Sequence, residues 1–368
     1  MTARALPLSP RFLAVLVLAL AAMASVPLLV DSSYLLHLFI VLFSAAVLGL
    51  AWNVIGGFGG QYSVGHAAYF GLGAYAAVIL FTKLHIPPWY GAFLGMGLSV
   101  AVAWVIGSIT FRLRGPYFVL ASIAVAEILR LTALNWKPMT NAAEGILMGD
   151  VPPLVLGPLR IGFDSKVPYY YIGLALVLAG LLVNWQVKRS RLGYWLQAIR
   201  EDQDAAWSLG IPPTRTKNAG LMISAALTAL VGCYTAMYTG FIDPPGVLDL
   251  GISVQIVLTC IIGGIGTVAG PVVGALLLTL LSEALRANLL ASALFALGVP
   301  EASAFGMFLR ENLAHAHVLV YGILVVVVIL FMPDGVLGFV EKRLQARRVR
   351  ALAKLAAAGP PPAPQGKA

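Results

Sequence analysis

The sequence predicts an all-α protein that crosses a membrane many times. Hydrophobic residues make up 60% of the 368 residues and charged residues only 11%, whereas soluble domains carry about 25% charged residues. The mean hydropathy is +0.90. Apolar runs recur along the chain, and most of them approach the length of about 20 residues that a helix needs to cross a bilayer.

The apolar runs predict about ten spans, some of them broken by glycine. They lie near 12–30, 34–55, 66–82, 89–111, 116–135, 168–187, 218–241, 250–266, 268–289 and 315–333. Glycines interrupt the eighth and ninth of these runs, so eight to ten spans fit the sequence. The first run has an alternative interpretation. The basic residues before it and Ala22-Met23-Ala24 within it also resemble a signal peptide that is cleaved near residue 24.

The distribution of basic residues predicts the orientation. Cytoplasmic segments of membrane proteins collect Lys and Arg, and with ten spans most of the 24 Lys and Arg residues share a side with both termini. This places the termini in the cytoplasm and explains the net charge of +9 without nucleic acid. Residues 1–340 then form one membrane domain, with a cytoplasmic loop at 188–217 and outer loops at 136–167 and 290–314. Residues 341–368 form a basic, partly disordered cytoplasmic tail.

The cytoplasmic loop is the longest polar stretch between apolar runs. It reads KRSRLGYWLQAIREDQDAAWSLGIPPTRTK. Residues 194–209 contain no Gly or Pro and place apolar side chains near one face, which predicts one short amphipathic helix. Gly210 provides a stop, and Pro212 and Pro213 prevent the helix from continuing. Both ends of this helix are joined to spans, so a push on it would reach the membrane.

This loop resembles the coupling region of the permeases of ABC importers. Asp204-Ala205-Ala206-x-x-x-Gly210 is similar to their Glu-Ala-Ala-x-x-x-Gly motif, with Asp keeping the charge of Glu, and residues 190–211 and 216–232 look like the LivM branch of the branched-chain amino-acid permease family. In that family the helix docks in a cleft of the ATPase subunit. The alternative is a solvated loop without a partner. By resemblance, the ATPase-coupling residues are Gly193, Arg200, Glu201, Asp202, Asp204, Ala205, Ala206 and Gly210.

Two glycine-rich stretches resemble further signatures of the same family. Residues 53–75 are similar to N-x-x-x-G-x-x-G-Q-x-S-x-G-H, and residues 262–275 to G-G-x-G-T-x-x-G-P-x-x-G-A. Glycine lets a buried backbone leave helical geometry, so we expect broken helices beside the translocation path. The alternative is tight helix packing with a polar turn. The residues assigned to the path are Gly59, Gln61, Ser63, Gly65, His66, Glu127, Gly263, Gly264, Gly266 and Gly270.

Two pairs of opposite charges lie within predicted spans. Glu127 and Arg130 are three residues apart on one helix face, and Glu283 and Arg286 repeat that spacing near the end of the ninth span. Charges inside a membrane are costly and by default mark a functional path, which is the reason for including Glu127 above. The alternative is a structural ion pair within the helix.

The sequence offers no constellation for catalysis. It contains no G-x-x-x-x-G-K-[ST] loop and no H-E-x-x-H motif, and its two cysteines lie inside apolar runs. We therefore expect no enzyme activity and no metal or cofactor on this chain, with ATP used by separate subunits.

The resemblance implies a multi-pass permease subunit of an ATP-driven importer in a bacterial inner membrane. The implied solute is a branched-chain or other hydrophobic amino acid. The implied partners are a second homologous permease, two cytoplasmic ATPase subunits, an outer solute-binding protein and membrane lipid, with no nucleic acid. Two alternatives remain, namely a permease for urea or short amides in the same family and an ion-coupled secondary transporter that uses Glu127.

Overall fold

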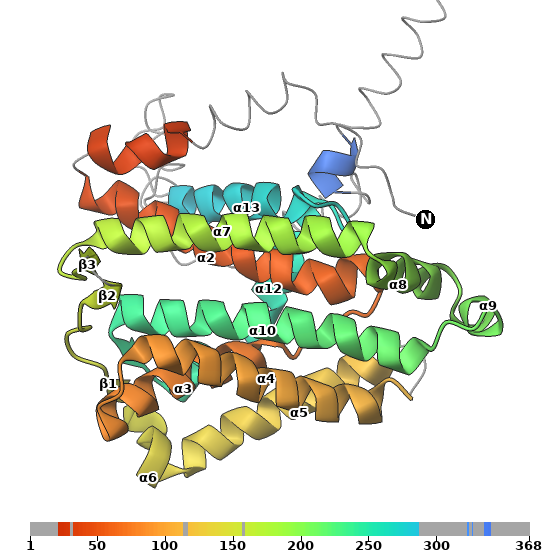
Figure 1. Ribbon diagram of the computed structural model, residues 1–368, viewed down its shortest axis with the longest axis horizontal. Helices are drawn as coiled ribbons and strands as arrows, with labels where there is room; N and C mark the ends of the chain where they lie inside the picture. Colours follow the sequence, from red (N-terminus) through yellow and green to blue (C-terminus); the bar gives the residue numbers. More distant parts are fainter. Residues whose placement is uncertain are drawn as a thin grey trace, which may run out of the picture.

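The computed structural model describes residues 21–29, 32–112, 117–156 and 159–286, with short pieces at 322–323, 326 and 335–339. Long helices lie side by side in it, with the small strands at one end and the short helices α8 and α9 at the other (Figure 1). We call these the strand end and the α8–α9 end. The long helices are α2 (Ser33–Trp52), α3 (His66–Leu84), α4 (Pro88–Thr110), α5 (Tyr117–Asn135), α7 (Lys166–Arg189), α10 (Pro213–Thr239), α12 (Leu250–Gly263) and α13 (Gly270–Arg286).

Seven described helical segments are long and apolar enough to cross a membrane. They coincide with the seven spans predicted between residues 34 and 266, which confirms the polytopic helical fold. The span predicted at 268–289 corresponds to a shorter apolar helix, Gly270–Ala284. Most of the predicted spans at 12–30 and 315–333, the loop at 290–314 and the tail at 341–368 lie outside the described residues.

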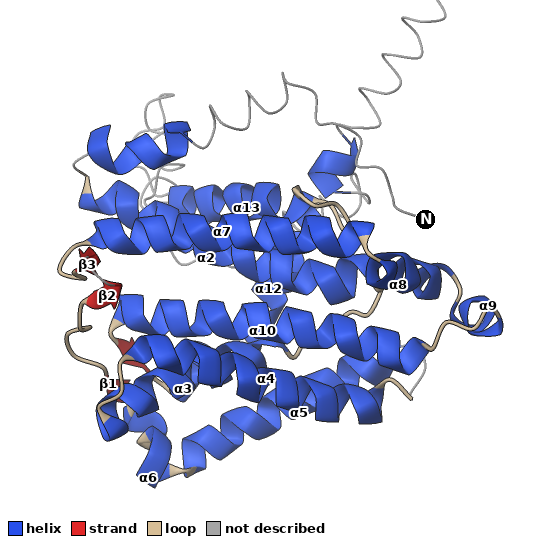
Figure 2. Cartoon of the chain, viewed as in Figure 1, coloured by secondary structure: helices blue, strands red, loops and turns tan. Residues whose placement is uncertain are grey.

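The strand end contains the loop at 136–167 and short elements that close it (Figure 2). The strand β1 (Ile146–Leu147) pairs antiparallel with β4 (Phe241–Ile242), and β2 (Leu154–Leu156) pairs with β3 (Leu159–Ile161). The β1–β4 pair joins this loop to the segment that follows α10. The remaining short elements are α6 (Lys137–Thr140), η2 (Ala142–Glu144) and α11 (Pro244–Leu248).

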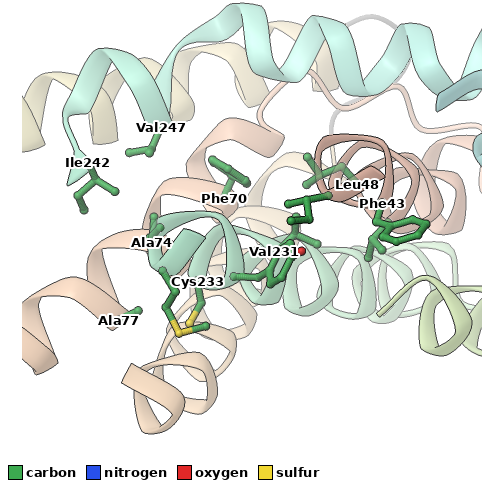
Figure 3. Close-up of a cluster of buried hydrophobic side chains, with 14 of the residues drawn as sticks. Phe43, Leu48, Phe70, Ala74, Ala77, Val231, Cys233, Ile242 and Val247 are labelled. Atoms are coloured by element: carbon green, nitrogen blue, oxygen red, sulfur yellow. The ribbon is translucent and has the colours of Figure 1, made fainter. Parts of the chain in front are cut away.

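The largest buried cluster lies where α2, α3 and α10 meet, and Figure 3 shows Phe43, Phe70 and Val231 within it. Small residues let these helices approach closely, as is typical of helix packing in membranes. A Cβ atom on Gly73 of α3 would lie only 1.9 Å from the carbonyl oxygen of Ala229 on α10. Only glycine therefore fits this crossing unless the helices move apart.

Candidate functional site

The polar stretch at 188–217 forms the α8–α9 end of the bundle (Figure 1). The prediction of one helix over 194–209 is wrong, because the stretch folds as α8 (Arg191–Glu201) and α9 (Gln203–Ser208). Asp202 separates them with an extended backbone, and its carboxylate accepts hydrogen bonds from the backbone N–H groups of residues 204 and 205, each at 2.9 Å. An Asp side chain competes for backbone donors in this way, which favours a helix cap over a helix interior.

The buried face of α8 holds the helix against the bundle. Leu196 is fully buried and packs with Val54, Phe58 and Val187. A Cβ atom on Gly193 would lie 2.0 Å from the carbonyl oxygen of Val187, so the start of α8 is pressed against the end of α7. Any displacement of α8 must therefore move the neighbouring helices or break this packing.

The outer face of α8 and α9 combines acidic and large apolar side chains. Tyr194 and Trp207 are each 65% exposed, and Leu209 is 83% exposed. Large aromatic and apolar side chains exposed in a charged segment are typical of surfaces that bind another protein. None of these three residues was assigned to the docking surface from the sequence, although bulky apolar residues inside a charged stretch are a signal for one.

The predicted coupling residues divide into two groups. Gly193 and Ala206 are buried, and Arg200 reaches inward to the bundle. The helix stop predicted at Gly210 is confirmed, because this residue follows α9 with a φ of 85°. The other exposed members of the predicted set are Glu201, Asp202, Asp204, Ala205 and Gly210, and the side chain of Arg200 is itself 38% exposed.

Both helix breaks predicted from the glycine-rich stretches are present. The helix α2 continues as a π-helix, η1 (Asn53–Phe58), and residues 59–65 then lead to α3. The second break separates α12 from α13, and within it Gly264 and Gly266 have φ values of 127° and 74°. Side chains other than glycine are strained at such values. Single-turn π-helices are frequent at functional sites.

The two breaks are joined by Asn53, which is fully buried. Its Oδ1 accepts a hydrogen bond from the backbone N–H of Gly266 at 2.9 Å, and its Nδ2 donates to the carbonyl oxygen of Thr267 at 2.8 Å. The same Nδ2 donates to Oδ1 of the buried Asn184 on α7 at 3.0 Å. Asn184 in turn donates to the carbonyl oxygens of Leu50 and Gly180. Asn53 is the first residue of the signature at 53–75 but was not assigned to the path, and Asn184 was not singled out from the sequence, although a polar residue inside an apolar run is itself a signal.

The turn after η1 is held by a buried histidine. His66 Nδ1 lies 3.1 Å from Ser63 Oγ, and its Nε2 lies 2.7 Å from Ser224 Oγ on α10. A Cβ atom on Gly65 would lie 2.4 Å from the carbonyl oxygen of Ser122 on α5. Ser63, Gly65 and His66 thus tie α3 to α5 and α10, which is the geometry of tight packing around a polar turn. Gln61, closer to solvent, donates to the carbonyl oxygen of residue 59.

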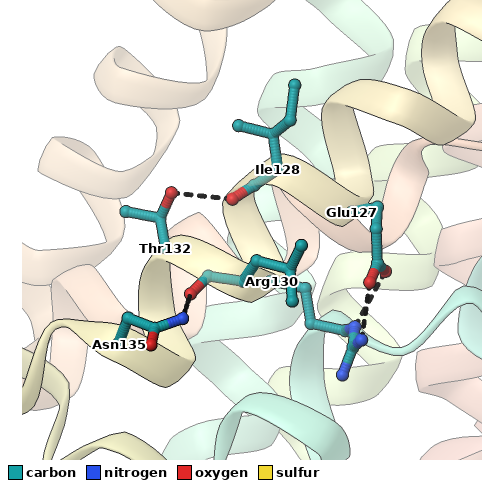
Figure 4. Close-up of polar contacts among 6 residues, drawn as sticks. Glu127, Ile128, Arg130, Thr132 and Asn135 are labelled. Carbon is teal, nitrogen blue, oxygen red and sulfur yellow. Dashed lines mark hydrogen bonds and ion pairs between the residues drawn. The ribbon is translucent and has the colours of Figure 1, made fainter.

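The charged pair predicted on α5 is present (Figure 4). Arg130 donates two hydrogen bonds to the carboxylate of Glu127, at 2.6 and 2.8 Å. This bidentate geometry fits a structural ion pair within the helix. On α13, the carboxylate of Glu283 accepts a hydrogen bond from Oη of Tyr34 at 2.6 Å.

Two cavities flank α2 and α12. One, of ≈ 480 Å³, lies among α2, α10, α11 and α12 and includes Asp243 in a mostly apolar lining. The other, of ≈ 710 Å³, lies between α2, α12 and α13 and includes Glu283. Val41 and Gln255 line both, so the cavities adjoin. Their sizes fall within the range of sites for small molecules, about 300–1,000 Å³.

The described part of the chain contains no group of three or more His, Cys, Asp or Glu residues that could hold a metal ion. Cys233 and Cys260 are buried free thiols.

A family model and individual relatives place this chain in the same protein family. The family model described as "Branched-chain amino acid transport system / permease component" matches residues 34–329. The chain is 29% identical over 261 residues to the high-affinity branched-chain amino acid transport system permease protein LivM of Salmonella typhimurium, covering 65% of this chain and 61% of LivM. It is 27% identical over the same length, with the same coverage, to LivM of Escherichia coli.

A further relative is the high-affinity branched-chain amino acid transport system permease protein BraD of Pseudomonas aeruginosa, 25% identical over 311 residues. That match covers 80% of this chain and 91% of BraD. The matches to LivM span less than two thirds of the LivM chains. No solved structure gives a significant match.

Proposed function

Because this chain belongs to the family of permease components of branched-chain amino acid transport systems, we propose that it forms part of the translocation path of an ATP-driven importer. The proposed solutes are branched-chain or other hydrophobic amino acids, as the names of the LivM and BraD relatives suggest. ATP hydrolysis takes place on separate ATPase subunits. The chain itself transports and does not catalyse.

The observation that carries this proposal is the exposed face of α8 and α9. It presents Asp204, Ala205 and Gly210 of the Asp204-Ala205-Ala206-x-x-x-Gly210 motif together with Trp207 and Leu209, and large apolar groups at such exposure favour a covering partner. The segment is anchored at both ends, since α8 follows α7 after Ser190 and α10 starts at Pro213. An ATPase subunit bound here would pull on two membrane helices at once.

The orientation follows from charge. Lys188, Arg189, Arg191 and Arg215 surround the α8–α9 end, and the positive-inside tendency places such an end in the cytoplasm. The strand end then faces outward and meets an extracytoplasmic solute-binding protein. These placements describe a multi-pass protein of a bacterial inner membrane, embedded in lipid.

The proposed path runs along the two cavities beside α2 and α12. Their linings are mostly apolar, with polar groups such as Gln255 at intervals, which suits a solute with an apolar side chain and charged ends. Val41, Leu250 and Val254 are exposed on this side of the chain. A second, homologous permease covering this side would enclose the path between the two subunits.

Reconstitution tests the proposal. The chain is co-expressed with a second permease and ATPase subunits, and uptake of labelled leucine into vesicles is measured with and without ATP. We expect uptake that requires ATP and is competed by valine and isoleucine. Uptake driven by a proton or sodium gradient without nucleotide would overturn the proposal. Competition by urea or acetamide in place of valine would move the solute class to short amides.

A charge-reversal pair tests the docking face directly. Asp204→Lys should lower co-purification of the ATPase several-fold, because the residue is exposed at the α8–α9 end. Asp164→Lys is the matched control, since Asp164 is also exposed but follows β3 at the strand end. Equal co-purification of both variants with the wild type would count against the assignment of α8 and α9 as the ATPase contact.

A further inference from the structure

We propose that Arg200 is a positioning residue that ties α8 to the junction of the two helix breaks, so that movement of α8 reaches the transmembrane helices. This inference rests on the function proposed above and deepens it. It also distinguishes Arg200 from the other exposed residues of α8 and α9, because one end of its guanidinium group donates a hydrogen bond into the bundle.

The contacts of Arg200 show that its side chain reaches from α8 toward η1. Its Nη1 donates a hydrogen bond to the carbonyl oxygen of Gly57 in η1 at 2.9 Å. The aliphatic part of its side chain lies over the turn after η1, where a Cβ atom on Gly60 would be 2.5 Å from Arg200 Cγ. The side chain is 38% exposed, and its Nη2 also donates to Glu201 at 2.9 Å. One end of the guanidinium thus binds the bundle while the other stays at the surface.

The second break lies beside the same group. A Cβ atom on Gly266 would be 3.1 Å from Arg200 Nη1 and 3.2 Å from the carbonyl oxygen of Gly57. A Cβ atom on Gly57 would be 2.8 Å from the backbone nitrogen of Gly266. The guanidinium therefore reaches this junction because Gly57, Gly60 and Gly266 have no side chains.

The bond to Gly57 also has an electrostatic reason. The segment Ser33–Phe58 is one helix of 26 residues, and the carbonyl groups in its last turn need partners from outside the helix. Gly60 and Gln61 donate to the carbonyls of Gly56 and Ile55, and Arg200 donates to that of Gly57. A cation at the C-terminal end of a helix interacts favourably with these carbonyls and with the helix dipole. Because a bond from a charged donor is roughly twice as strong as a neutral one, Arg200 holds this helix end firmly.

From Gly57, Asn53 extends the connection to other helices. A Cβ atom on Gly57 would be 1.9 Å from Oδ1 of Asn53. This Oδ1 accepts the hydrogen bond from Gly266, and Nδ2 of the same side chain donates to Thr267 and Asn184. One contiguous set of contacts thus links α8, η1, the α12–α13 break and α7. A displacement of α8 cannot leave these segments unchanged while the contacts persist.

The first experiment compares Arg200→Gln with Arg191→Gln in reconstituted transporter. Both make the same change on α8, and Arg191 is exposed. The measured quantity is the amount of leucine transported per ATP hydrolysed. For Arg200→Gln we expect this ratio to fall about tenfold, with ATPase co-purification unchanged, and for Arg191→Gln we expect the wild-type ratio. Arg200→Lys, which keeps the charge and one donor, should recover part of the ratio.

Two results would overturn the proposal. A drop in ATPase co-purification with an unchanged ratio would make Arg200 a docking residue. A parallel loss of uptake and hydrolysis with a lower unfolding temperature, again at an unchanged ratio, would make it only a stabilising cap.

A second measurement does not depend on transport. Amide hydrogen exchange is followed in the isolated chain at Gly60 and Gln61 of the first break and at Gly266 of the second. We expect Arg200→Gln to accelerate exchange at both breaks and Arg191→Gln at neither. Unchanged exchange at Gly266 would refute the tie between the breaks. If the wild-type transporter shows no ATP-dependent uptake, the proposed function fails, while this measurement still decides the role of Arg200.

Discussion

The crossing of α3 and α10 provides a test of the packing in which the size of the perturbation follows from the structure. Gly73→Ala adds a Cβ atom 1.9 Å from the carbonyl oxygen of Ala229, whereas ordinary contact begins near 3.4 Å. The two helices must therefore separate by roughly 1.5 Å at this point. The helix α3 has little room to move away from α10, because α4 packs against the same turn of α3. A Cβ atom on Gly95 of α4 would lie 2.9 Å from Gly73 Cα.

Two terms set the expected change in the free energy of unfolding. Overpacking of this kind typically costs about 1–3 kcal/mol. Replacing glycine by alanine inside a helix contributes about 1 kcal/mol in the opposite direction. We therefore expect Gly73→Ala to destabilise the protein by up to about 2 kcal/mol.

The assay measures the unfolding temperature in detergent. Fluorescently tagged protein is heated, and the fraction that remains folded is measured by size-exclusion chromatography. Gly97→Ala is the matched control, because no atom outside its own helix lies within 4 Å of a Cβ atom placed at Gly97. Its unfolding temperature should equal or exceed that of the wild type. If Gly73→Ala is as stable as Gly97→Ala, the close crossing of α3 and α10 is not required and the packing argument is wrong.

Three further predictions address the site. The double variant Trp207→Ser, Leu209→Ser should weaken ATPase binding several-fold in pull-down assays. Its unfolding temperature should equal that of the wild type, because both side chains are largely exposed. A lower unfolding temperature would contradict a purely external role. His66→Ala should destabilise the protein by about 1–3 kcal/mol, measured by the same thermal assay, since it removes a buried partner of Ser63 and Ser224. Glu127→Gln should lower the unfolding temperature, because it leaves Arg130 without its ion-pair partner. Adding Arg130→Gln should restore much of the lost stability, and uptake should persist in this double variant. Loss of uptake in the double variant would instead favour a role for Glu127 in the translocation path.

Much of the fold could be predicted because hydropathy is a local property of the sequence. The seven long apolar helices found at the predicted positions show this, but the ends of these helices also depend on tertiary contacts. The helix α10 begins at Pro213, five residues before the predicted span at 218–241. Its polar first turns are accommodated because Lys217 donates to Gln203 and Asn218 donates to the carbonyl oxygen of Trp104. Hydropathy alone has no access to such partners.

The site was less predictable, because the directions in which its side chains point depend on contacts between segments that are distant in the sequence. The helix stop at Gly210 and both glycine-rich breaks follow from local backbone chemistry and could be predicted. The split at Asp202 also has a local cause, but helix propensity along 194–209 concealed it. The pairing of Asn53 with Thr267 spans 214 residues of sequence, and the inward direction of Arg200 depends on that same junction.

The arrangement of these contacts separates two tasks that the resemblance had assigned to a single surface. A residue that binds an ATPase needs exposure, whereas a residue that transmits the movement needs contacts within the bundle. Trp207 and Asp204 meet the first requirement, and Arg200 meets the second. Because Asp202 breaks the helix between them, Asp204 and Trp207 lie on α9, whereas Arg200 lies on α8, which is packed on the bundle through Leu196. Substitutions in α9 should therefore change affinity for the ATPase, and substitutions on the inner face of α8 should change the transport obtained from each ATP.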